Sequence, residues 1–112
     1  MPNDHSDLGR FSDPAMLILA SLAAEPRHGY AIMEDIASFS GTRFEPGTLY
    51  GALARLEHAG LIEPLEASGR RRPYALTAAG TRLLEARLAT LDRVVDAARL
   101  RLRRAPASRP AE

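Results

Sequence analysis

The stretch that decides the fold is PGTLYGALARLEHAGLI, residues 46–62, followed eight residues later by RRRPYALT, residues 70–77. Leu49, Leu53 and Leu56 are spaced by four and three residues, so they share one face of a predicted helix. The small and polar residues of this helix are expected to point elsewhere: Thr48, Gly51, Ala52 and Arg55. Gly60 predicts where the helix ends, because glycine readily adopts the left-handed conformation of a helix C-terminus.

Two further helices are predicted before this one. Asp13 and Pro14 indicate the start of the first, since aspartate caps a helix and proline suits its first position. The second is expected to open at residues 27–30 and to run to about Phe39, and a glycine-containing loop then leads to Pro46. Apolar runs at residues 61–66 and 73–76 flank the basic segment and predict a two-stranded hairpin. The predicted fold is mainly α with a small β-hairpin: a winged helix-turn-helix with a long C-terminal dimerisation helix.

The last helix is predicted from Thr77, its cap, to about Arg104. Its apolar positions alternate by four and three residues, which is typical of a coiled-coil seam. Because such a seam needs a partner, we expect a homodimer. The expected domains are a flexible leader (1–11), a DNA-binding winged helix-turn-helix (12–77), a dimerisation helix (78–104) and a disordered tail (105–112). The seam residues, expected at the dimer contact, are Leu84, Leu88, Leu91, Val95, Ala98 and Leu102.

Composition excludes several functions. The 112 residues include no cysteine, which excludes disulfides and thiolate sites. The three histidines lack carboxylates at ligand spacing, and no nucleophile has a base at a recognisable spacing, so neither a metal site, a cofactor nor an enzyme is expected. No signal peptide or run of about 18 apolar residues is found, so we expect a cytoplasmic protein without a membrane span.

Charge is distributed unevenly along a chain whose net charge is only +1. Residues 1–69 carry 4 Arg and 10 Asp or Glu, whereas residues 70–112 carry 11 Arg and 4 acidic residues. The basic tip Arg70, Arg71 and Arg72 is expected to contact DNA phosphates or a minor groove, the alternative being a solvated loop. On the predicted recognition helix, the expected DNA contacts are Thr48, Tyr50 and Arg55. Two alternatives stay open: Tyr50 packs under the hairpin, and Thr48 only caps the helix.

These motifs, in this order, make the chain resemble the PadR-like family of bacterial transcriptional regulators across about residues 12–103. The resemblance rests on LILASL (17–22), PRHGY (26–30), PGTLY (46–50), LARLE (53–57) with GLI (60–62), and RRPYALTAAG (71–80). It implies a winged helix-turn-helix that dimerises through its C-terminal helix, and usually a repressor of neighbouring genes. It also implies that Thr48, Tyr50 and Arg55 belong to the recognition helix and Arg70, Arg71 and Arg72 to the wing. The chain looks like the short branch of the family, which lacks a further C-terminal region.

The resulting hypothesis is a homodimeric repressor that binds a near-palindromic double-stranded DNA operator. The alternative is a winged-helix protein-docking module without specific DNA binding, because a fold does not determine a function. Some short family members bind planar apolar compounds on a tryptophan, and this chain has none. The effector that the sequence leaves open is a small apolar or aromatic compound, in a gap between the first and last helices lined by Phe11, Met16 and Leu91.

Overall fold

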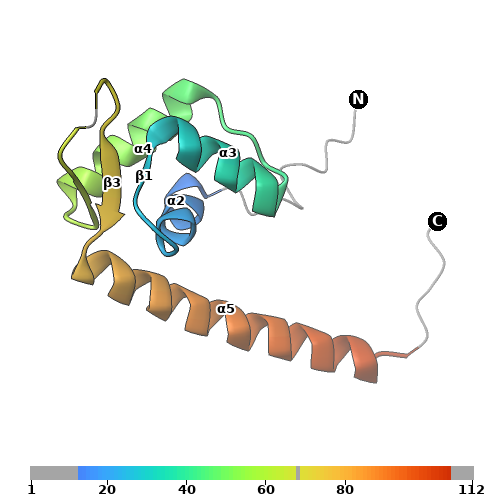
Figure 1. Ribbon diagram of the computed structural model, residues 1–112. Helices are drawn as coiled ribbons and strands as arrows, with labels where there is room; N and C mark the ends of the chain where they lie inside the picture. Colours follow the sequence, from blue (N-terminus) through green and yellow to red (C-terminus); the bar gives the residue numbers. More distant parts are fainter. Residues whose placement is uncertain (1–12, 68, 107–112) are drawn as a thin grey trace.

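The computed structural model describes residues 13–67 and 69–106, and Figure 1 shows a head of short helices with a small sheet at one end, above one long helix. The expected leader, including Phe11, and residues 107–112 of the expected tail lie outside the described residues. Within the described part, the elements in chain order are α2 (Pro14–Leu22), β1 (Arg27–His28), α3 (Gly29–Ser40), α4 (Pro46–His58), β2 (Ile62–Pro64), β3 (Pro73–Leu76) and α5 (Ala78–Arg104).

Side-chain caps begin three of the helices. Asp13 Oδ1 accepts a hydrogen bond from the Ala15 N–H (3.0 Å), and Thr77 Oγ1 accepts one from the Gly80 N–H (3.0 Å), so both predicted caps are confirmed. The third cap differs from the prediction. Residues 27 and 28 do not open α3; His28 precedes it, and its Nδ1 accepts from the Ala31 N–H at 3.3 Å. His28 is therefore the N-cap of α3.

The predicted end of α4 is confirmed in detail. Gly60 has φ = +79°, in the left-handed region. The Gly60 N–H donates to the Glu57 carbonyl and the Leu61 N–H donates to the Leu56 carbonyl, each at 3.0 Å. This pair of bonds is the Schellman motif, which satisfies carbonyls at a helix end and turns the chain sharply. The turn directs the chain straight into β2.

The sheet has three antiparallel strands in the described part, where the sequence predicted two. Its order is β1-β3-β2, with Arg27 opposite Tyr74, His28 opposite Pro73, and Ile62 opposite Leu76. β1 has only two residues. Such a segment is too short to show the alternating pattern of a strand, and it becomes one only by pairing with β3. The third strand joins the start of α3 to the wing.

The hydrophobic core lies where α2, α3 and α4 pack together. Residues of these helices and of β2 fill it, and α5 contributes only Leu84, which is 6% exposed. Leu84 belongs to the core of its own chain, so its expected place in the seam is corrected. Its position near the start of α5, beneath the head, explains the difference, because the seam pattern cannot tell the chain's own core from a partner. The other buried members of the core are Ile18, Leu19, Leu22, Ile32, Ile36, Leu49, Ala52, Leu53, Leu56 and Ile62.

Helix α5 is much longer than the head above it. Its 27 residues correspond to about 40 Å at 1.5 Å per residue. Figure 1 shows its C-terminal half running past the other helices. Of the remaining seam residues, Leu91 is partly buried, while Leu88, Val95, Ala98 and Leu102 are exposed, Leu102 by 76%. Across residues 13–67 and 69–106, no helix combines the length and the apolar character that crossing a membrane requires.

Candidate nucleic-acid interface

Helix α4 presents one face to the core and another to solvent. Leu49, Leu53 and Leu56 are buried as predicted, and Thr48 and Arg55 are exposed. Ala52 was expected on the outer face but is only 1% exposed. It follows Leu49 by three residues and therefore lies on the inner face. The outer face is consequently narrower than predicted.

Two glycines, Gly47 and Gly51, leave α4 without a side chain at two positions. A Cβ added at Gly47 would meet no atom within 4 Å, so this part of the helix borders open space. A Cβ at Gly51 would lie 3.6 Å from Arg55 Nη1, which places the Arg55 guanidinium beside Gly51 on the helix surface. The exposed guanidinium has its hydrogen-bond donors available to a ligand at this surface.

The wing is the loop between β2 and β3, closed at its base by a hydrogen bond from the Leu65 N–H to the Pro73 carbonyl (2.8 Å). Gly69 has φ = +65° near its tip. Arg70, Arg71 and Arg72 follow and are all exposed. In Figure 1 the wing and the beginning of α4 lie toward the upper side of the molecule, whereas α5 runs along the bottom. The basic segment and the predicted recognition helix thus lie away from α5.

A groove of about 360 Å³ lies where the wing, α4 and the start of α3 meet. It brings Tyr50 together with the three wing arginines, whereas Thr48 and Arg55 do not line it. Tyr50 is 49% exposed, and its ring end rests on Gly29, where an added Cβ would come within 2.5 Å of Oη. Tyr50 therefore packs against the start of α3 while remaining half open to solvent. The full lining is His28, Gly29, Tyr30, Tyr50, Arg70, Arg71, Arg72 and Tyr74.

His28, Tyr30 and Tyr74 were not among the predicted site residues. They reach the groove because β1 pairs with β3, which sets residues 27 and 28 opposite residues 74 and 73. The only linear signal was the proximity of His28 and Tyr30 in the PRHGY segment, which says nothing about the wing. Pairing between segments more than forty residues apart decides this part of the site.

The acidic residues of α3 are paired with neighbouring groups. Glu34 forms a two-pronged ion pair with Arg43, with Nη1–Oε2 at 2.8 Å and Nη2–Oε1 at 3.2 Å. The Arg43 hydrogen bond is the main cause that lowers the pKa of Glu34. Asp35 accepts a hydrogen bond from Ser21 Oγ (2.8 Å). Their negative charges are therefore partly compensated within the head.

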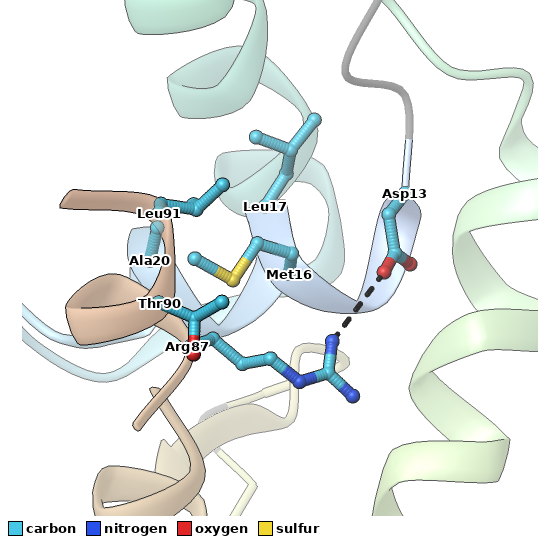
Figure 2. Close-up of a pocket in the computed structure, with 7 residues that line it drawn as sticks. All are labelled: Asp13, Met16, Leu17, Ala20, Arg87, Thr90 and Leu91. Atoms are coloured by element: carbon cyan, nitrogen blue, oxygen red, sulfur yellow. Dashed lines mark ion pairs between the residues drawn. The ribbon is translucent and has the colours of Figure 1, made fainter. Parts of the chain in front are cut away.

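A second hollow, apolar in character, lies between α2 and α5. It has a volume of about 520 Å³. Figure 2 shows Met16 and Leu17 of α2 facing Leu91 of α5, and the Asp13–Arg87 ion pair at one edge (3.9 Å). Ala20 and Thr90 complete its lining. Met16 and Leu91, the two described residues of the expected gap, do line it.

The described residues offer no group of three or more His, Asp and Glu side chains that could hold a metal ion. The arginines, the tyrosines and His28 that line the groove between the wing and α4 form a surface suited to an anionic partner.

Comparison with known proteins shows the family of the chain. Residues 18–86 match the model of the family described as "Transcriptional regulator PadR-like family". An uncharacterized 37.1 kDa protein in transposon TN4556 of Streptomyces fradiae is 57% identical over 76 residues, which cover 68% of this chain and 22% of that protein. The matching part of the chain thus spans about a fifth of that relative.

Three solved structures illustrate the similarity in fold. A PadR family transcription regulator from Clostridium difficile has a TM-score of 0.72 and 26% identity over 80% of this chain and 97% of its own. A PadR family regulator from Eggerthella lenta has a TM-score of 0.67 and 32% identity over 81% and 82%. RosR from H. salinarum has a TM-score of 0.66 and 32% identity over 78% and 80%.

Proposed function

The chain belongs to the PadR-like family of transcriptional regulators, and from this membership we propose that it is a homodimeric repressor of a near-palindromic DNA operator. It is a winged-helix DNA-binding regulator and not an enzyme. Such a role requires access to the chromosome, so the location that we propose is the cytoplasm.

The observation that carries this proposal is the groove that Tyr50 of α4 shares with Arg70, Arg71 and Arg72 of the wing. A helix docked in a major groove reads bases from its exposed face, and arginines beside it neutralise the adjoining phosphates. In this proposal Thr48 and Tyr50 bond phosphates and Arg55 reaches a base edge. The wing arginines lie along the flanking backbone or minor groove.

Dimerisation supplies the spacing of two such heads. The seam residues Leu88, Val95 and Leu102 are exposed and follow a coiled-coil pattern. The C-terminal half of α5 runs past the other helices (Figure 1). Pairing of two α5 helices buries these side chains. Two recognition helices then enter successive major grooves about 34–36 Å apart, and the bound dimer blocks a promoter.

The apolar hollow between α2 and α5 supports a second proposal, a small apolar or aromatic effector that lowers operator affinity. Its lining by Met16, Leu17 and Leu91 fits such a ligand. A ligand that prefers one arrangement of α5 would change the spacing of the heads, and thereby the fit to DNA. Thermal-shift screening of aromatic and amphiphilic compounds, followed by binding assays with DNA, tests this.

The decisive experiment is a mobility-shift assay with the DNA upstream of the protein's own gene and with fragments selected from genomic DNA. We expect one fragment class to bind far more tightly than random duplex. Joint replacement of Arg70, Arg71 and Arg72 by alanine should weaken binding to every duplex and flatten its salt dependence, by about 0.9 in logarithmic slope for each phosphate that the variant no longer neutralises. Arg55→Ala should alter preference among sequences instead.

Two results would contradict the proposal. An unchanged salt slope in the triple variant would exclude the wing from the DNA contact. Weak binding without sequence preference would favour the alternative, a protein-docking module whose basic wing meets an acidic partner.

A further inference from the structure

His28 carries two contacts that cannot both be hydrogen bonds. Its Nδ1 lies 3.3 Å from the Ala31 backbone nitrogen, and its Nε2 lies 3.4 Å from Arg71 Nη1. Both neighbours are donors, because a backbone N–H and a guanidinium have no acceptor to offer. A neutral imidazole has one accepting and one donating nitrogen. One of the two contacts must therefore place two donors face to face.

The cap decides which nitrogen accepts. The Ala31 N–H is one of the first four of α3, which have no partner within the helix, and it is partly buried. Arg71 is exposed and is free to turn toward another partner. The cap therefore takes the accepting nitrogen, and Nε2 carries the proton. The Nε2–H and the Arg71 guanidinium then face each other as two donors in need of a common acceptor.

The surroundings specify the chemistry of that acceptor. The groove around this pair is lined by three arginines and three tyrosines, and none of its described lining residues is acidic. The pairing of His28 with Pro73 in the sheet fixes the imidazole beside the base of the wing. A compact oxyanion with several accepting oxygens satisfies both donors at once, and phosphate is such a group.

We infer that His28 and Arg71 jointly hold one phosphodiester of the DNA backbone, at the junction of wing and recognition helix. His28 is then a DNA ligand as well as a helix cap, and Arg71 acts at this phosphate rather than in the minor groove. The bound oxygen replaces the unfavourable donor pair with two hydrogen bonds. This inference rests on the proposed function, because it assumes a DNA partner.

The test uses His28→Asn, since asparagine is among the best helix caps but is too short to place a donor at the Nε2 position. The second variant is Arg71→Ala, and Arg70→Ala is the matched control. Binding to the selected operator fragment is measured at one fixed pH for all variants. We expect His28→Asn to weaken binding about 5-fold with the salt slope unchanged, and Arg71→Ala about 10-fold with the slope reduced by about 0.9.

The shared phosphate predicts that the effects do not multiply. The product of the two single losses in affinity is about 50-fold. The double variant should lose clearly less affinity than this, because either change alone weakens the common contact. His28→Asn combined with Arg70→Ala should instead be multiplicative. Circular dichroism and thermal unfolding should show that His28→Asn retains the fold. Multiplicative losses in the His28–Arg71 pair would overturn the inference.

Neutral phosphates locate the site. Duplexes in which single phosphates are replaced by methylphosphonate should reveal one position at which the loss of binding is smaller for His28→Asn alone and for Arg71→Ala alone than for the wild type. If His28 were only a cap, His28→Asn would lose as much as the wild type at every position and the inference would fail. The inference would also fail if inorganic phosphate at constant ionic strength perturbed the His28 ring resonances while no methylphosphonate substitution gave the expected change in DNA binding. The site would then bind free anions and not the DNA backbone.

These outcomes separate the inference from the proposed function. Equal binding to random and selected duplex would overturn the specific-operator function, yet the two-variant comparison on random duplex would still decide whether His28 and Arg71 share a phosphate. Absence of any DNA binding would overturn both.

Discussion

The winged head, residues 13–77, covers most of its large aliphatic side chains, whereas α5 leaves most of its own exposed. Among the buried hydrophobic residues only Leu84 belongs to α5, while Leu88, Val94, Val95, Leu100 and Leu102 are all exposed on that helix. The head thus builds its core from its own helices and strand, with Leu84 as the one buried contribution from α5. Among the described residues, no other element covers the C-terminal half of α5 (Figure 1). The difference teaches that contacts among the described residues bury the apolar side chains of the head, whereas they leave most of those on the long helix exposed.

The largest effect should come from the core of the head. Leu53→Ala removes a side chain that is 1% exposed and leaves a cavity, so we expect the free energy of unfolding to fall by about 2–5 kcal/mol. The matched control is Arg55→Ala, on the exposed face of the same helix, with an expected change within about 0.5 kcal/mol. Urea denaturation measures both. Equal losses would contradict the division between an inner and an outer face of α4.

The next prediction tests whether a second copy of the chain covers the apolar face of α5. Val95→Asp places a charge in the proposed seam, and burying an unpaired carboxylate is strongly unfavourable. We expect self-association to weaken about 100-fold, or about 2.7 kcal/mol, measured by sedimentation equilibrium. The control is Ala89→Asp, which introduces the same charge at an exposed position outside the seam. This variant should associate as the wild type does. A wild-type protein that is monomeric at micromolar concentration would refute the comparison as drawn.

A smaller effect concerns the joint between the two regions. Gly80 is buried at the start of α5, where an added Cβ would collide with the Leu61 carbonyl. Because backbone must move to relieve this clash, Gly80→Ala should destabilise the protein by about 1–3 kcal/mol. Gly51→Ala is the control: its Cβ meets only the Arg55 guanidinium at 3.6 Å, and alanine favours a helix by up to about 1 kcal/mol. The midpoint temperature of thermal unfolding should be highest for Gly51→Ala, intermediate for the wild type and lowest for Gly80→Ala.

The smallest effect lies on the surface of the head. The Arg43 hydrogen bond lowers the pKa of Glu34 in the folded state, against an opposing contribution from desolvation. A lowered folded-state pKa means that this pair stabilises the protein at neutral pH and that the contribution is lost as the pH falls through that pKa. Arg43→Ala should therefore raise the pKa of Glu34 toward its ordinary value. Carboxyl NMR titration checks this, and Arg55→Ala should leave the Glu34 titration unchanged.

Much of the fold was predictable because its signals are local. The hydrogen bonds by which Asp13 and Thr77 cap a helix, and those that end α4 at Gly60, join groups within five residues of one another, so the adjacent sequence predicts them. The spacing of Leu49, Leu53 and Leu56 likewise needs only the period of a helix. These features determined the helices and the wing.

The errors arose where burial depends on another element. Because alanine is small, the residue type alone does not show which face of α4 carries Ala52. The packing of α4 against the core decides that Ala52 is buried. Leu84 fits the seam pattern equally well, yet the head covers it. Periodicity identifies an apolar face but not the surface that will cover it.

The sequence by itself determined the helix ends, the family, the basic wing and the apolar seam, because hydrogen bonds and side-chain periodicity act over a few residues. Only the tertiary structure decided that β1 joins the sheet, that His28 meets Arg71, and that Tyr50 shares a groove with the wing. His28 and Arg71 are separated by 43 positions. No local pattern specifies such a contact, since it forms only when the core has brought the strands together.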